Sequence, residues 1–130
     1  MSQPLYTSIA IDDDPLFLEQ LESFIEEIDW LSLTEKHISP VKAATAIIRR
    51  QPDVLFLDIE MPHVDGYELL DWIQPKLKDM DPYPHVVIIS AVKEKLHNYE
   101  KRQIHGMIYK PDLKSPQDLE RLLRSVLKIQ

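Results

Sequence analysis

The sequence predicts an α/β fold: one doubly wound, five-stranded parallel sheet with helices on both faces. Two observations carry this prediction. Short apolar runs without strict alternation, typical of strands buried on both faces, alternate along the chain with stretches of helical periodicity. A capping side chain followed by proline, the favoured start of a helix, occurs three times, at Asp14-Pro15, Ser39-Pro40 and Ser115-Pro116. An alternation of strands and helices with right-handed crossovers follows.

Five strands are expected, and each of them is short. Four are the apolar runs SIAI, VLFL, VVII and MIY, and the second along the chain is a less apolar stretch. In chain order the expected strands are residues 8–11, 31–37, 54–57, 86–89 and 107–109.

Five helices are expected between and after these strands. They begin at Pro15, Pro40, Tyr67, Lys93 and Pro116, and the third and fourth end near residues 77 and 102. The periodicity of residues 93–102 is weak, whereas the other four have apolar residues at helical spacing that mark the faces expected to be buried. These residues are Leu18, Leu21, Phe24 or Ile25, and Ile28; Val41, Ala44, Ile47 and Ile48; Leu69, Leu70 and Ile73; and Leu119, Leu122, Leu123, Val126 and Leu127.

The composition fits a single domain over residues 1–130. A chain that is 44% hydrophobic and 28% charged matches a globular protein rather than a disordered one. No apolar run is long enough to span a bilayer, no secretory signal is visible and there is no cysteine, so we expect a cytoplasmic protein without membrane contact. The net charge of −7 argues against direct binding of nucleic acid by this chain.

Functional residues are expected beyond the carboxyl ends of the strands, where open parallel sheets form their sites. Four of the five expected strands are followed directly by a polar residue, which makes the pattern specific. They are Asp12, Asp13 and Asp14 after the first strand, Asp58 after the third, Ser90 after the fourth and Lys110 after the fifth.

Clustered carboxylates need a counter-charge, because several of them cannot all stay ionised cheaply at one place. Mg²⁺ prefers oxygen ligands and usually binds through one or two carboxylates together with phosphate oxygens. A carboxylate beside the metal can act as a nucleophile toward a phosphoryl group, whose charge the metal and a lysine would neutralise. The chemistry inferred from these residues is phosphoryl transfer onto an aspartate.

These residues resemble the receiver domain of bacterial two-component response regulators, over essentially the whole chain. The matching stretches are IAIDDD, VLFLDIEMPHVDG, VVIISA and YKP, in family order and near family spacing. The resemblance implies a CheY-like, flavodoxin-like (βα)5 fold. Within the family, AIDDDPLFLEQLESFI and LFLDIEMP are most similar to receivers attached to LytTR-type DNA-binding domains.

The resemblance implies that Asp58 is the phosphoacceptor, in a Mg²⁺-dependent reaction with the phosphohistidine of a sensor histidine kinase or phosphotransfer protein. Asp13 would bind the metal directly, Asp12 mainly through water, and Asp58 and the backbone carbonyl of Glu60 would complete the ligand set. Lys110 would contact the phosphoryl group, and its bond to the following proline is expected to be cis, as in the family.

Ser90 corresponds to the hydroxyl that moves toward the phosphoryl group on activation, but the rest of the family's switch departs from the pattern. Receivers usually carry Tyr or Phe three residues before the lysine, and here that residue is Met107. Because side chains alternate along a strand, Tyr109 should share a face with Met107, one step nearer the site. Either residue is a candidate for the switch role.

Plainer interpretations compete at several positions. Asp14, directly before a proline, is better explained as a helix cap than as a metal ligand. Ser90 is alternatively an ordinary hydroxyl at a strand end, and Lys110 an ordinary surface lysine. Gly66 and Gly106 are most simply turn residues with positive φ.

Three functions are compatible with the sequence. The first is a phosphorylation-controlled switch, which is not an enzyme beyond its own phosphorylation and dephosphorylation. The second, an aspartate-nucleophile phosphatase, expects a D-x-D pattern where this chain has DIE. The third is a pseudo-receiver, a binding module with a decayed site, which the complete residue set disfavours.

The sequence does not identify what the switch controls. The output contact, with an effector or in a dimer, is expected on the face formed by helix 93–102, strand 107–109 and the helix from Pro116. No effector domain is visible within the chain, so it is either a receiver acting by protein contacts or the N-terminal receiver of a LytTR-type transcriptional regulator.

Overall fold

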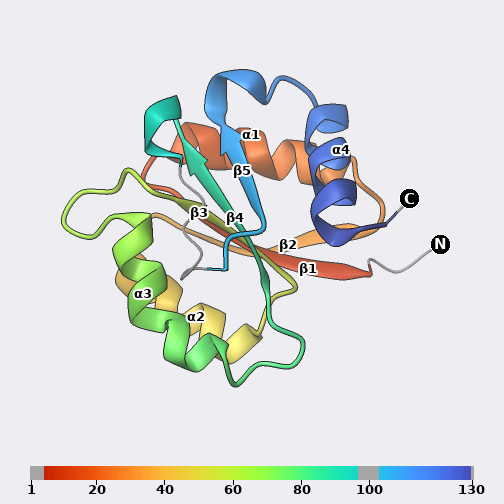
Figure 1. Cartoon of the computed structure of the whole chain (residues 1–130). Helices are drawn as coiled ribbons and strands as arrows, with labels where there is room; N and C mark the ends of the chain where they lie inside the picture. The colour runs from red at the N-terminus through yellow and green to blue at the C-terminus, as the bar shows by residue number, and fades with distance from the viewer. Residues whose placement is uncertain (1–4, 97–102, 130) are drawn as a thin grey trace.

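The computed structural model describes residues 5–96 and 103–129 and contains one sheet of five parallel strands. The strand order is β2-β1-β3-β4-β5 (Figure 1), the order typical of flavodoxin-like folds. The predicted fold class is therefore confirmed. The strands are β1 (Tyr6–Ile11), β2 (Leu31–His37), β3 (Val54–Asp58), β4 (His85–Ser90) and β5 (Gly106–Tyr109).

Helices cover both faces of the sheet, with α1 and α4 on one face and α2 and α3 on the other (Figure 1). In the described part of the chain the α-helices are α1 (Pro15–Glu26), α2 (Pro40–Arg50), α3 (Gly66–Leu77) and α4 (Pro116–Leu127). Two short 3-10 turns also occur there, η1 (Lys93–Lys95) after β4 and η3 (Lys110–Asp112) between β5 and α4. None of these described helices has the length and apolarity that crossing a membrane would require.

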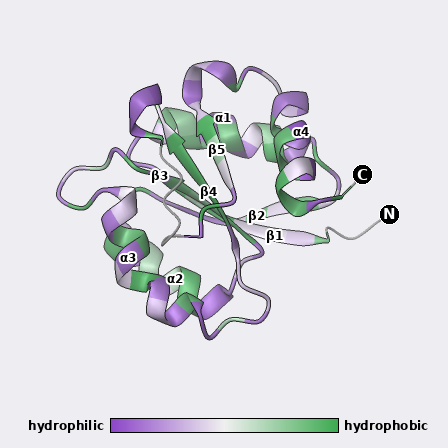
Figure 2. Ribbon diagram, viewed as in Figure 1, coloured by the Kyte–Doolittle hydropathy of each residue, from purple (hydrophilic) through white to green (hydrophobic). Residues whose placement is uncertain are grey.

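The sheet separates two apolar cores. Ile9 and Ile11 of β1 point toward α2 and α3, whereas Ala10 between them points toward α1 and α4. All five residues of β3 are buried, as expected for a central strand covered on both faces. Figure 2 shows the same pattern, with hydrophobic residues concentrated in β3 and β4 and helices that carry both hydrophobic and hydrophilic residues.

Two of the three predicted helix caps form the expected hydrogen bond. The Asp14 carboxylate accepts from the backbone N–H of Leu16 at 3.0 Å, and the Ser115 hydroxyl accepts from the N–H of Asp118 at 3.2 Å. Ser39 occupies the cap position of α2, but its side chain makes no capping hydrogen bond.

The predicted helix over residues 93–102 is not continuous. In its described part, η1 forms over Lys93–Lys95, and Leu96 then takes an extended backbone conformation with φ −83° and ψ 104°. Residues 97–102 lie outside the described part of the chain, which therefore contains four α-helices instead of five. The interruption at Leu96 agrees with the weak helical periodicity of the sequence at this place.

The buried face of α2 also differs from the prediction. Ala44 and Ile47 are buried as predicted, but Val41 and Ile48 are 63% and 40% exposed, and Ala43 and Ala46 are buried in their place. Alanines are weak markers of a buried face in a sequence, yet their small side chains let a helix lie close to the sheet. The contact face is thus rotated away from Val41 and Ile48.

Both glycines have negative φ, so the predicted turn role for them is wrong. Steric space explains them instead. A Cβ on Gly66 would lie 2.4 Å from the carbonyl oxygen of Asp58, and a Cβ on Gly106 would lie 2.7 Å from Cγ2 of Val126. Gly66 allows the first turn of α3 to pass directly against the backbone of the predicted phosphoacceptor.

Gly66→Ala is expected to lower the free energy of unfolding by about 3 kcal/mol, because the new methyl group meets backbone that cannot move aside. Gly106→Ala is the control, since the atom it meets belongs to a side chain that can shift, and its loss should be nearer about 1 kcal/mol. Urea unfolding of the two variants measures the difference, and equal losses would contradict this account.

Candidate functional site

The parallel register gathers the ends of four strands at one edge of the sheet. Ile11 of β1 lies opposite Leu57 of β3, and Ser90 of β4 lies opposite Tyr109 of β5. The residues that follow these pairs leave the sheet together. The polar strand ends singled out in the sequence therefore meet at a common edge.

Asp12, Asp13 and Asp58 form an acidic cluster, with one carboxylate oxygen from each lying within 4.8 Å of the others. Asp12 and Asp58 are buried, and Asp13 is exposed. One oxygen of Asp58, Oδ1, accepts the backbone N–H of Glu60 at 3.0 Å. Its other oxygen, Oδ2, is buried without a hydrogen-bond partner in the part of the chain that the structure describes.

Asp14 has a different role from its two neighbours, as predicted. Its side chain caps α1, and the acidic cluster found among the described residues does not include it. The backbone N–H of Asp14 donates to Oδ1 of Asp12 at 2.9 Å, which helps to hold that carboxylate in place.

Lys110 supplies the counter-charge for the cluster. Its Nζ lies 2.9 Å from Oδ2 of Asp12 and 4.7 Å from the ring centroid of Phe17. Burial acts to lower the pKa of Lys110, but the ion pair with Asp12 and the nearby charge of Asp58 outweigh it and raise the pKa. The lysine is therefore held as a cation at the site.

The surroundings of Asp58 disfavour the ionised form of its carboxyl group. Burial, together with the neighbouring Asp12 carboxylate, raises the pKa of Asp58 to about 8, against the lowering effects of the Glu60 N–H and of Lys110. A buried carboxylate that lacks a full set of partners favours the approach of a cation.

Ser90 is placed at the same edge but is bound to Glu60. Its hydroxyl lies 2.6 Å from Oε1 of Glu60, which also accepts the N–H of Ala91 at 2.7 Å. Burial acts to raise the pKa of Glu60, but these hydrogen bonds and nearby Lys95 lower it. The side chain of Glu60 is thus an ionised acceptor.

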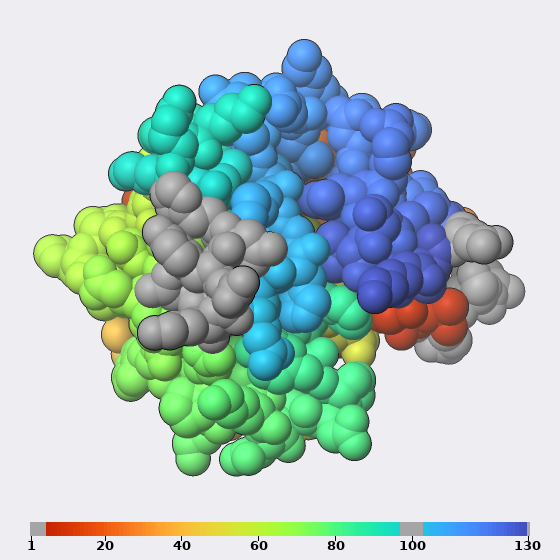
Figure 3. All heavy atoms as spheres, viewed as in Figure 1, coloured from red at the N-terminus to blue at the C-terminus, as the bar shows by residue number. Residues whose placement is uncertain are grey.

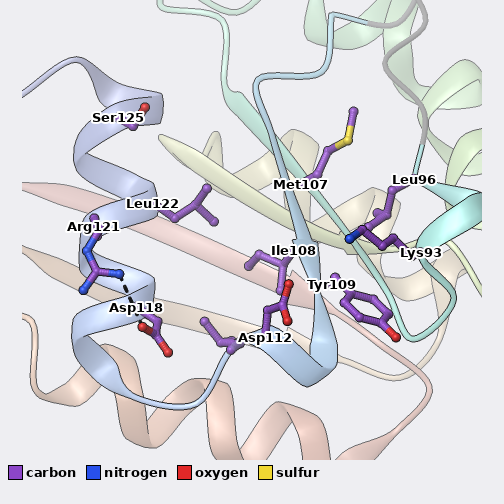
Figure 4. A pocket seen from close by; sticks show the side chains of 11 residues that line it. Lys93, Leu96, Met107, Ile108, Tyr109, Asp112, Asp118, Arg121, Leu122 and Ser125 are labelled. Atoms are coloured by element: carbon purple, nitrogen blue, oxygen red, sulfur yellow. Dashed lines mark hydrogen bonds and ion pairs between the residues drawn. The ribbon is translucent and has the colours of Figure 1, made fainter.

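Met107 and Tyr109, the two candidates for the switch, both line a groove of about 700 Å³ between η1, β5 and α4 (Figure 4). Met107 packs against the core on the α2 and α3 side, while Ile108 faces the other core, as strand alternation predicts. Lys93 Nζ lies 5.9 Å from the ring centroid of Tyr109.

The bond between Lys110 and Pro111 is not cis, contrary to the expectation from the family. The cis peptide bond among the described residues joins Asp81 to Pro82. Lys110 instead opens the 3-10 turn η3, in which the N–H of Leu113 donates to its carbonyl at 3.1 Å. A trans proline has a φ that suits the start of such a turn.

Two contributors were missed by the sequence reasoning. The Glu60 side chain, considered only for its backbone carbonyl, binds the segment after β4, and Phe17 of α1 lies against the Lys110 ammonium. For the Glu60 side chain the sequence did contain a signal, since an acidic residue stands two positions after Asp58. No sequence signal pairs Phe17 with a lysine so distant along the chain.

A doubly wound parallel sheet with a cluster of buried carboxylates and a lysine at its carboxyl edge defines a class of phosphoacceptor domains. The model of the response regulator receiver domain matches residues 9–124, and the chain belongs to this family. Receiver domains generally accept a phosphoryl group on an aspartate and bind Mg²⁺ through an acidic cluster such as that of Asp12, Asp13 and Asp58.

Relatives and solved structures agree with this assignment. A response regulatory protein from Yersinia pestis is 30% identical over 122 residues, which cover 93% of this chain and 47% of that protein. The transcriptional regulatory protein BtsR from Escherichia coli K12 is 31% identical over 86 residues, 66% of this chain and 34% of BtsR. The chain thus spans between about a third and about half the length of these relatives.

The similarity to solved structures concerns the fold. A CheY-like receiver domain from Methylobacillus flagellatus matches with a TM-score of 0.78 at 20% identity, covering 94% of this chain and 98% of that one. The response regulator domain of Thermotoga maritima CheB matches with a TM-score of 0.75 at 21% identity, covering 95% and 97%.

The narrower resemblance to receivers of LytTR-type regulators is not supported by these comparisons. The relatives that they name are described as response regulatory proteins, as the regulator BtsR and as a protein-glutamate methylesterase. Short stretches around a shared active site are too similar across the family to separate its branches.

The raised pKa of Asp58 predicts how stability depends on pH without metal. Between about pH 4 and pH 8 the folded protein holds a proton on this carboxyl that the unfolded chain has lost. The stabilising effect of that proton is fully present below pH 4 and is lost as the pH rises toward 8, at up to about 1.4 kcal/mol per pH unit. Asp58→Asn should remove this loss.

Urea unfolding in Mg²⁺-free buffer across this range measures the effect. Asp79→Asn, which removes an exposed carboxylate from the loop after α3, is the matched control and should keep the pH dependence of the native protein. Parallel pH profiles for the native protein and Asp58→Asn would show that Asp58 ionises normally.

Proposed function

We propose that this domain accepts a phosphoryl group on Asp58 from the phosphohistidine of a sensor histidine kinase or phosphotransfer protein, and then changes conformation to control an output. The observation that carries the proposal is the convergence of Asp12, Asp13 and Asp58 at one sheet edge, with Lys110 paired to Asp12 at 2.9 Å. Sequence match to the receiver family gives independent support.

The residues fit a Mg²⁺ ion. The donors are hard carboxylate oxygens, and the buried Oδ2 of Asp58 lacks a hydrogen-bond partner among the described residues. In this proposal Asp12, Asp13, Asp58 and the backbone carbonyl of Glu60 hold the metal. When bound, Mg²⁺ supplies positive charge that offsets the negative charge of the transferred oxygens.

The reaction is a displacement at phosphorus. A carboxylate oxygen of Asp58 forms the new bond to phosphorus while the bond from phosphorus to the imidazole nitrogen of the donor breaks. The electron pair of that bond leaves with the nitrogen, which takes a proton from water. The attack needs Asp58 in its ionised form, which a cation at the site favours by lowering the pKa of that carboxyl.

Lys110 and Ser90 act on the transferred group. In this proposal the Lys110 ammonium, which is held as a cation beside Asp12, pairs with a phosphoryl oxygen. The Ser90 hydroxyl would donate to another phosphoryl oxygen after leaving its present partners. Its movement, together with a rearrangement of Met107 or Tyr109 on β5, is the switch in this proposal.

The output contact is assigned to the face of η1, β5 and α4, which carries the groove described above. Figure 3 shows η1, the segment from β5 to η3 and α4 on one side of the molecule. Its lining mixes apolar and charged side chains, including Leu96, Leu122 and Arg121. An effector or a second copy of the chain would bind here, close enough to Tyr109 to sense the switch.

The proposal also covers the extent of the domain and its location in the cell. Residues 1–130 are interpreted as one receiver domain, and its location as cytoplasmic, where receivers meet their kinases. A solved structure of RcsB from Salmonella enterica bound to a promoter is similar in fold to this chain, with a TM-score of 0.71 at 19% identity. That activity is a property of RcsB and is not carried over to this chain.

The native protein should take up one phosphoryl group when incubated with acetyl phosphate and Mg²⁺, and Asp58→Asn should take up none. Intact-protein mass spectrometry measures the uptake. Omission of Mg²⁺ provides the control for metal dependence. A native protein that stays unmodified would contradict the proposal and favour a pseudo-receiver.

A pair of neighbouring variants tests the division of labour among the aspartates. Asp13→Ala should abolish Mg²⁺-dependent phosphorylation, because it removes a metal ligand at the exposed side of the cluster. Asp14→Ala should keep phosphorylation and lower the free energy of unfolding by about 1 kcal/mol, the usual cost of losing a helix cap. Loss of Mg²⁺ binding in Asp14→Ala would overturn this assignment.

A further inference from the structure

The Glu60 carboxylate binds the segment that follows β4, at the same edge of the sheet as the acidic cluster. Oε1 of Glu60 lies 2.6 Å from the Ser90 hydroxyl and accepts the Ala91 N–H at 2.7 Å, and Oε2 lies 3.7 Å from Nζ of Lys95. Glu60 belongs to the loop after β3, so these contacts join two loops that flank the acceptor. We name this set of contacts the Glu60 clasp.

A second bond supports the same arrangement from α3. The hydroxyl of Tyr67 donates to the backbone carbonyl of Lys95 at 2.6 Å. The segment between Ser90 and Leu96, which includes η1, is therefore held at its start by Glu60 and near its end by Tyr67. Both of these attachments are made by side chains, those of Glu60 and Tyr67.

Ser90 has a single hydroxyl proton, and its partners are already in place. The oxygen accepts the N–H of Val92 at 2.8 Å, and the proton lies between Oε1 of Glu60 at 2.6 Å and the carbonyl of Val92 at 2.8 Å. The shorter contact is to a carboxylate, and hydrogen bonds to charged acceptors are the stronger ones. Ser90 cannot donate to a phosphoryl group without giving up this bond.

We propose that the Glu60 carboxylate competes with the phosphoryl group for the Ser90 hydroxyl, and so sets how readily the segment after β4 moves when Asp58 is modified. The inference rests on the proposed function of Asp58. Glu60 is a positioning residue in this view: it acts through Ser90 and Ala91. Two anionic acceptors share one donor, and the relative strength of their bonds sets the populations of the two arrangements.

The presence of the clasp can be measured in metal-free protein. Amide hydrogen exchange at Ala91 should be about tenfold faster in Glu60→Ala than in the native protein, because the acceptor of its N–H is gone. Glu60→Gln keeps a side-chain oxygen at this place and should lie between the two. Glu68→Gln, which neutralises an exposed carboxylate on α3, is the control for charge and should leave the exchange unchanged.

The competition itself is tested with beryllofluoride, a mimic of the phosphoryl group, in the presence of Mg²⁺. Glu60→Ala keeps its backbone carbonyl and should bind beryllofluoride about tenfold more tightly than the native protein, since Ser90 is released. Removing the negative charge of Glu60 would by itself also favour binding of the anionic beryllofluoride. The same substitution in a Ser90→Ala background measures that charge effect, and there the gain should be clearly smaller.

The outcomes separate the two proposals. A native protein that does not bind beryllofluoride with Mg²⁺ would overturn the proposed function, and the competition with it. A native protein that binds, combined with an equal gain from Glu60→Ala in both backgrounds, would overturn only the competition. If amide exchange at Ala91 is unchanged in folded Glu60→Ala, the Glu60 clasp does not exist as described. If Glu60→Ala does not fold, unchanged exchange in Glu60→Gln would lead to the same conclusion.

Discussion

The site depends on two buried carboxylates that lie beside one partly buried cation. The parallel register places Asp12 and Asp58 side by side at the end of the sheet, and the Lys110 ammonium pairs with Asp12 at 2.9 Å. Burial, together with the neighbouring Asp12 carboxylate, raises the pKa of Asp58 to about 8, and the single positive charge of Lys110 does not offset this. The neighbouring backbone also adapts to this acceptor, because the absence of a side chain at Gly66 lets α3 begin against it.

This imbalance is a cost to the folded state that a bound cation relieves. Stability and function are therefore opposed at this edge, and among the described residues the buried charged side chains are Asp12 and Asp58, both of which belong to it. Functional sites commonly violate the rules that the rest of a fold obeys. Here the violation is confined to strand ends, where a cation can reach it from solvent through the exposed Asp13.

Much of the fold could be predicted from the sequence, because the strong signals were local. Buried strands were visible as apolar runs, and the Asp14 and Ser115 caps were visible as short motifs before proline. The errors arose where tertiary packing decides: the alanine face of α2, the steric role of the glycines and the interrupted stretch after Lys95. The acidic cluster was predictable because parallel strand ends must meet. The contacts of the Glu60 side chain were not predictable, because its partners come from a distant loop.

Both groups that a phosphoryl group would recruit are already bound to carboxylates of the protein, Lys110 to Asp12 and Ser90 to Glu60. Modification of Asp58 would therefore exchange existing charged contacts for new ones instead of adding contacts to free groups. An exchange of this kind yields a smaller net gain than the new bonds alone would give, so the two arrangements stay close in free energy. If the domain switches as proposed, modest changes at the positions that bind Ser90 or Lys110 should be enough to shift the populations of its two arrangements.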